Sequence, residues 1–167
     1  EHAKAKKWDS VPSIDTYKFK KENSSDNRGE RTKVKVTFYE RLNNGGQYDA
    51  IWTYDPRTNR YLRTIGGRVD IDQETDTQVY AKNVILQQVT LSPSYDNKAR
   101  VILETIGEGK ATYLIDGKVI SGKWKKSTRT SRTKYYNNEG EEIQFNRGRI
   151  WVSTYPHSAG KFDIIEQ

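Results

Sequence analysis

The sequence has no cysteine, no methionine and only two histidines among its 167 residues. Without cysteine the chain has no disulfide, no thiolate ligand for a metal and no thiol nucleophile. His2 lies at the start of the chain, and His157 follows Pro156 in a loop-like stretch near its end. This placement disfavours a Ser-His-Asp or Cys-His nucleophilic site, which needs a histidine held beside the nucleophile.

Long apolar runs are also missing, because no stretch approaches the roughly 20 residues that cross a bilayer as a helix. Since Glu1 is not a translation start, we expect a fragment or a processed form, in which the lack of an export signal carries no information. Residues 1–15 are polar and are expected to be a linker or an expression remnant. Residues 16–167 are expected to form a single β domain.

The residues that are present favour strands. Only 33% of the chain is hydrophobic, and 11 Tyr and 4 Trp, with Val and Ile, supply most of that surface. Aromatic and β-branched side chains suit a pleated, half-buried surface. Val34, Val36 and Phe38 alternate with polar residues, the period of a strand with one buried face. Asp116-Gly117 separates two apolar runs, as a type I′ hairpin turn requires.

Alternation and turn signals together predict roughly ten or eleven short strands and no amphipathic helix. The apolar run at 84–86 indicates a strand covered on both faces. The fold class expected is mainly β, an antiparallel sandwich or a partly open barrel with few or no helices. The predicted strands cover residues 16–20, 34–38, 48–54, 59–65, 79–91, 100–106, 111–115, 118–124, 132–136, 142–146 and 149–155.

The positive charge is concentrated in one stretch. Residues 117–150 contain nine Lys and Arg against three Glu and so carry most of the formal net charge of +7. A basic face attracts polyanions such as nucleic acid, anionic lipid or the phosphates of wall polymers. The alternative is a solvated face that keeps the protein soluble.

Within this stretch, residues 122–136 interleave cations with aromatic side chains, a pattern that suits binding of an anionic polymer. Trp124 also fits an inward strand position, and a buried indole cannot stack on a ligand. None of the known nucleic-acid modules has its motif here in full, so nucleic acid is a disfavoured partner. The candidate binding residues are Trp124, Lys125, Lys126, Arg129 and Arg132.

A second candidate platform lies in the hairpin predicted at 48–65. Tyr54 and Arg63 lie on its two strands, where an aromatic ring and a forked donor suit sugars or bases. Ordinary cross-strand packing explains the same residues.

An acidic stretch at 70–76 provides a possible third site. In an extended backbone its alternating carboxylates, led by Asp70 and Asp72, would lie on one side, as a hard cation prefers. The stretch lacks the glycine and the distant glutamate of an EF-hand loop, and a solvated loop is the favoured alternative. A carboxylate pair for hydrolysis would need a second acid, for which Glu104 and Glu108 are available. No metal and no cofactor is expected.

Five strings of residues, in order, resemble the C-terminal domain of the YerB-like lipoprotein family, the domain of unknown function 3048. They are WTYD and YLR within 52–63, GGRVDID at 66–72, NVILQQV at 83–89, GEGKATYLIDGKVISGKWKK at 107–126 and TKYYNNEGEEIQFNRGRIWV at 133–152. The resemblance implies an exported, lipid-anchored envelope protein of mainly Gram-positive bacteria, in which an N-terminal domain precedes this one. Members tend to have histidine where this chain has Asp70, so a role for an imidazole there is in doubt.

These observations lead to an expected function. We expect an extracytoplasmic cell-envelope domain that binds or scaffolds an anionic cell-wall polymer or another envelope protein, and that meets the membrane only through a lipid anchor outside these residues. The N-terminal domain of its own full-length chain is a further expected partner. The alternatives are a carboxylate-dependent envelope hydrolase or transferase, using Asp70 and Asp72, and a nucleic-acid module.

Overall fold

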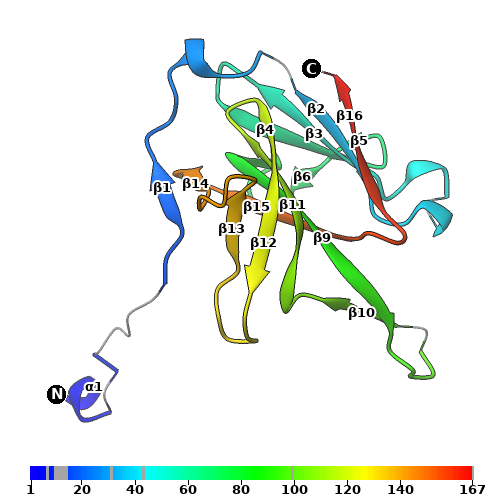
Figure 1. Ribbon diagram of the computed structural model, residues 1–167. Coiled ribbons are helices and arrows are strands. Elements are labelled where there is room, and N and C mark those ends of the chain that lie inside the picture. The colour runs from blue at the N-terminus through cyan, green and yellow to red at the C-terminus, as the bar shows by residue number, and fades with distance from the viewer. Residues whose placement is uncertain (7, 10–14, 31, 43, 99, 167) are drawn as a thin grey trace.

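The computed structural model describes residues 1–6, 8–9, 15–30, 32–42, 44–98 and 100–166. Two six-stranded sheets, here called sheet I and sheet II, form most of it (Figure 1). Sheet I contains β9 (Asn83–Pro93), β10 (Val101–Glu104), β11 (Gly107–Ile115), β12 (Lys118–Lys126), β13 (Lys134–Asn137) and β15 (Ile150–Pro156). Sheet II contains β2 (Lys33–Thr37), β3 (Ala50–Asp55), β4 (Arg60–Ile65), β5 (Arg68–Val69), β8 (Tyr80–Ala81) and β16 (Lys161–Glu166).

Four short strands form two further pairs. β1 (Lys18–Lys20) pairs in parallel with β14 (Gln144–Asn146), and β6 (Ile71–Asp72) pairs antiparallel with β7 (Thr77–Gln78). The described helices are the four-residue α1 (His2–Ala5), which buries no residue, and three single turns. None of the described helices is long and apolar enough to cross a membrane. The single turns cover Ser25–Asn27, Glu40–Leu42 and Asn44–Gly46.

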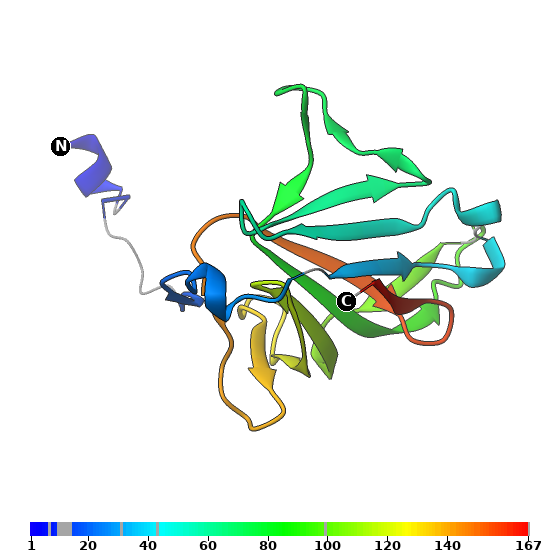
Figure 2. The ribbon, with the colours of Figure 1, turned by 90° about the horizontal axis from the view of Figure 1, so that it is seen from above.

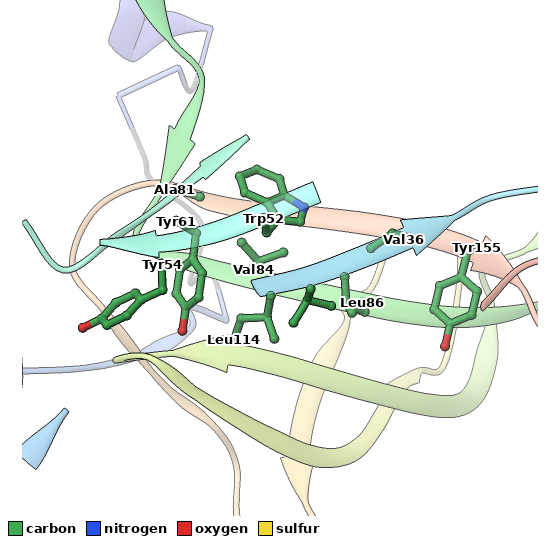
Figure 3. Close-up of a cluster of buried hydrophobic side chains, with 10 residues drawn as sticks. Val36, Trp52, Tyr54, Tyr61, Ala81, Val84, Leu86, Leu114 and Tyr155 are labelled. Carbon is green, nitrogen blue, oxygen red and sulfur yellow. The ribbon is translucent and has the colours of Figure 1, made fainter. Parts of the chain in front are cut away.

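Sheets I and II pack face to face over one apolar core (Figure 3). Sheet II contributes alternate residues such as Val34, Val36 and Trp52, and sheet I contributes Val84 and Leu86. All five side chains are fully buried. Because side chains alternate across a strand, this core takes one face of each sheet, as in a β sandwich.

A second core covers the opposite face of sheet I. Ile85 and Tyr113 on this face pack against Tyr135 of β13 and Phe145 of β14, with Tyr17 at its margin. β9 is therefore buried on both faces, as the apolar run at 84–86 predicted. Figure 1 shows that the loop joining β12 and β13 lies below the strands of sheet II, and Figure 2 gives the view from above, with sheets I and II stacked on each other.

The predicted fold class is confirmed: the chain is mainly β, with antiparallel pairing in most of its sheets and no closed barrel. The Asp116-Gly117 turn is also confirmed, since both residues have the positive φ of a type I′ turn, 52° and 72°. The structure differs from the expectation in its parallel pairs and in one added strand. β15 runs parallel to β9, as β1 does to β14, and β16 forms an antiparallel edge strand that the sequence did not predict.

Residues 1–15 were expected to be a linker or remnant. Of this range, residues 7 and 10–14 lie outside the described residues.

Candidate functional site

The basic stretch forms the β12–β13 hairpin, and its two faces differ. In register, Trp124 lies opposite Tyr135, and both side chains point into the second core. Lys125 lies opposite Lys134 on the other face. The alternation of a strand thus separates the indole from its cationic neighbours.

Trp124 is 2% exposed, and its Nε1 donates a hydrogen bond of 2.7 Å to the backbone oxygen of Gln88. Gly109 lies directly beneath the ring, where a Cβ would come within 2.7 Å of the indole nitrogen. The indole therefore holds the hairpin against β9 and β11 and offers no face for stacking.

The hairpin ends in an ordered loop over residues 127–133. The backbone N–H of Thr128 donates to Ser131 Oγ (2.9 Å), and that of Ser131 donates to Thr128 Oγ1 (3.1 Å). Lys126 Nζ donates to the backbone oxygen of Ser131. These bonds fix the loop without using a carboxylate.

Three cations of the expected binding set surround this loop. Arg129 is exposed and has no hydrogen bond or ion pair with another described residue. The Arg132 guanidinium lies 4.7 Å from the centre of the Tyr17 ring. Arg132, Tyr17 and Lys126 line an open cavity of about 660 Å³. Loop and cavity together are called the hairpin tip below.

Carboxylates reach this hairpin at two points. Glu108 pairs with Lys125 at 2.8 Å, and Asp15 pairs with Lys134 at 2.8 Å. The hydrogen bond from Lys125 lowers the pKa of Glu108, and the same bond raises the pKa of Lys125. Lys125 is thus the one residue of the expected cationic set that has a carboxylate partner among the described residues.

Tyr54 and Arg63 are brought into the core instead of onto an open platform. Tyr54 is 3% exposed, and its hydroxyl donates to Asn59 Oδ1 at 2.9 Å. Burial raises the pKa of Tyr54 to about 12. Arg63 lies opposite Trp52 in register, and its Cζ lies 4.8 Å from the centre of the Trp151 ring. Its guanidinium also pairs with the Asp70 carboxylate. These contacts agree with ordinary cross-strand packing, the alternative to a binding platform, for this hairpin.

The acidic stretch is not extended throughout. β6 and β7 pair across a turn at residues 73–76, so the four carboxylates do not line one side of a strand, and the favoured alternative of a loop between strands describes the stretch better. Asp70 accepts a hydrogen bond from the Arg63 guanidinium. Asp72 Oδ1 accepts the backbone N–H of Glu74 at 3.0 Å and closes the turn. Within the described part of the chain, no three His, Asp or Glu side chains are grouped to hold a metal ion.

A buried polar network at the Asp116-Gly117 turn was missed by the sequence analysis. Asp116 is 2% exposed and accepts hydrogen bonds from Lys20 Nζ (2.6 Å), Asn59 Nδ2 (2.9 Å) and Asn146 Nδ2 (2.6 Å). Burial alone would raise the pKa of Asp116, but these donors outweigh it and lower the pKa. The network joins the turn to β1, to the β3–β4 hairpin and to β14, so its role is to hold the two sheets together.

The fold places the chain among the all-β sandwich domains. Residues 34–152 match the family model described as the C-terminal domain of a protein of unknown function, DUF3048. This match spans most of the chain, and the chain therefore belongs to that family. The resemblance read from the sequence motifs is confirmed.

A solved structure, the YerB protein from Bacillus subtilis, has the same fold. It matches with a TM-score of 0.72 and 20% identity over 97% of this chain. The chain spans about half of YerB, covering 51% of that protein's chain. No curated protein sequence matches. At this identity the similarity to YerB shows the fold alone.

Proposed function

We propose that this domain is a non-enzymatic binding module of the bacterial cell envelope that holds an anionic polymer on the β12–β13 hairpin. The observation that carries the proposal is the hairpin tip. There Lys126 and Arg132 line an open cavity, and Arg129 lies in the adjoining loop. No carboxylate among the described residues pairs with any of the three, because Asp15, which also lines the cavity, pairs with Lys134. Several uncompensated cations in one place attract a polyanion more strongly than the same cations dispersed over a surface.

The order of the loop supports the proposal. A ligand binds more tightly when the residues that meet it are already fixed, because less conformational entropy is lost on binding. The reciprocal Thr128 and Ser131 hydrogen bonds fix the loop in this way. A face that served only solubility would need no such arrangement.

Binding is favoured over carboxylate-dependent catalysis because both candidate acids, Asp70 and Asp72, are already engaged in hydrogen bonds. The Asp70 carboxylate is engaged by Arg63 and that of Asp72 by its own turn. A general acid or base needs to be free to meet the substrate.

The test is retention on an immobilised anionic polymer, poly(glycerol phosphate), at low salt. Replacing Lys125, Lys126, Arg129 and Arg132 by Ser lowers the net charge from +7 to +3. We expect this variant to lose at least tenfold in affinity, since each cation near an anionic surface contributes on the order of 1 kcal/mol. Wild-type retention should also weaken as salt is added.

The matched control replaces four exposed cations elsewhere, Lys4, Lys21, Arg68 and Lys98, by Ser, which gives the same net charge of +3. Retention of the control should stay within about twofold of wild type. Equal loss in both variants would mean that net charge alone acts, and unchanged retention in the first variant would reject the hairpin. Tighter binding to duplex DNA than to the polymer would favour the nucleic-acid alternative.

A further inference from the structure

Sheet II leaves part of sheet I uncovered. Along β11, Leu114 lies in the core between the sheets, while Thr112, two residues earlier on the same face, lines an open cavity of about 480 Å³. Ser121 lies directly opposite Thr112 on β12 and lines the same cavity. Figure 1 shows the reason: the lower part of the β12–β13 hairpin extends below the strands of sheet II.

The charges along this uncovered face are arranged unusually. Lys110 of β11 lies directly opposite Lys123 of β12. Like charges at directly opposite positions destabilise a sheet. Two residues along, on the same face, these strands place Glu108 opposite Lys125, an ion pair of 2.8 Å. Glu108 also acts electrostatically on Lys123, which leaves Lys110 the less compensated of the two lysines.

The floor of the cavity is neutral and polar. The hydroxyls of Thr112 and Ser121 have no hydrogen-bond partner among the described residues. Gln88, which interacts with the Tyr155 hydroxyl, continues the floor on β9. Side chains of this kind can donate hydrogen bonds to the hydroxyl groups of a ligand and accept hydrogen bonds from them.

One wall of the cavity is aromatic. Tyr155 and Phe162 meet edge to face, with ring centres 6.4 Å apart, where the core between the sheets ends. In Figure 3, Tyr155 lies at the end of the core cluster opposite Tyr54. Phe162 is only partly buried and gives the cavity an apolar side.

We propose that this cavity binds a saccharide unit that carries an acidic group. The hydroxyls of Thr112 and Ser121 meet the sugar hydroxyls, Phe162 meets the apolar C–H face of the ring, and the acidic group relieves the repulsion between Lys110 and Lys123. The volume is that of a small-ligand site. The proposal rests on the proposed function in one respect: the saccharide is an acidic sugar unit attached to the bound polymer.

The experiment measures binding of three disaccharides by isothermal titration calorimetry: one with a uronate, one with a phosphate, and their neutral parent. We expect the acidic forms to bind wild type at least tenfold more tightly than the neutral parent. The uronate and phosphate arms identify which acidic group is preferred. Equal binding of all three, or no binding, would overturn the proposal.

The diagnostic variant is Lys110→Glu. It should lose at least tenfold in affinity for the acidic disaccharide, yet melt at the same temperature as wild type or higher, because it replaces the like-charge pair by an attractive one. A Thr112→Val, Ser121→Ala variant should lose affinity for the neutral and acidic forms alike. Wild-type affinity in either variant would exclude this cavity.

A third variant separates this inference from the proposed function. With Lys126, Arg129 and Arg132 replaced by Ser, polymer retention should fall while the disaccharide affinity stays within about twofold of wild type. Polymer retention by wild type without disaccharide binding would reject the saccharide site and leave the hairpin proposal intact. Disaccharide binding without polymer retention would reject the hairpin proposal and leave the saccharide site intact.

Discussion

At the scale of single residues, the same residue type has different roles because of its surroundings. Lys20 is bound to a buried carboxylate at 2.6 Å, whereas Lys110 faces another lysine. Trp124 is a core residue, although its neighbours in the sequence are solvated lysines. Position in the register therefore decides which cations remain available for a ligand.

The roles of residues such as Asp116 could not be predicted from the sequence. Asp116-Gly117 was identified as a turn because the dipeptide alone favours positive φ. The donors to Asp116 come from Lys20, Asn59 and Asn146, which are 96, 57 and 30 residues away. Contacts between such distant residues depend on the assembled fold and leave no local pattern.

Asp116 gives a prediction about stability and pH. The variant Asp116→Asn should unfold with a free energy about 2–4 kcal/mol lower than wild type at pH 7, because the Lys20 ammonium loses its charged acceptor and the two amides keep only a neutral one. The folded-state pKa of Asp116 is lowered, so its contribution is present above the unfolded pKa of about 4 and is lost as pH falls through the folded value. Urea unfolding at pH 7 and pH 3 measures both effects.

The control for that experiment is Asp76→Asn, which changes an exposed carboxylate in the β6–β7 turn. Its unfolding free energy should stay within about 0.5 kcal/mol of wild type. A stability gap between Asp116→Asn and wild type that is equally large at pH 3 would contradict the assignment of that gap to the ionised carboxylate.

At the scale of elements, local alternation predicts strands well and their partners poorly. β2, β3, β4, β9 and β12 overlap the ranges that the sequence predicted for them. The signal is clearest in β3, whose residues are alternately buried and half-buried, and in β9, which begins with a run of buried residues. β16 was missed because the adjacent Ile164 and Ile165 break the alternation, and its register with β2 shifts between Ile164 and Glu166. The parallel pairing of β15 with β9 has no local signal, since its two strands are separated in the chain by four others of the same sheet.

The turn between β11 and β12 gives a prediction at this scale. The variant Gly117→Ala should lose more than about 2 kcal/mol of unfolding free energy. The φ of Gly117, 72°, is unfavourable for alanine, and the added Cβ would lie 2.4 Å from the Tyr54 ring. Urea unfolding measures the loss.

Gly140 provides the matched comparison. Its φ is 87°, and a Cβ there would meet no atom within 4 Å. Gly140→Ala should therefore cost only the conformational penalty, about 1 kcal/mol. Equal losses in the two variants would mean that the packing of the turn against Tyr54 contributes nothing.

At the scale of the whole molecule, structural and binding roles occupy different regions. The two sheets and the Asp116 network form the rigid body, and they include the two residues, Tyr54 and Arg63, that were expected to form a second binding platform. The β12–β13 hairpin extends from that body (Figure 1), and it carries three cations, Lys126, Arg129 and Arg132, that have no carboxylate partner among the described residues. The sequence predicted the location of this charge along the chain, but not which cations are already paired.

The central claim is that one side of the molecule, the β11–β13 region with the hairpin tip, receives the polymer. A titration of the isotopically labelled domain with an anionic wall polymer, followed by amide chemical shifts in two-dimensional NMR spectra, tests it directly. We predict that the perturbed amides centre on residues 108–112 and 121–136, with Gln88, Tyr155 and Phe162 of the cavity at their margin. Perturbations centred on β9–β10 or on sheet II, or none at physiological salt, would contradict the account.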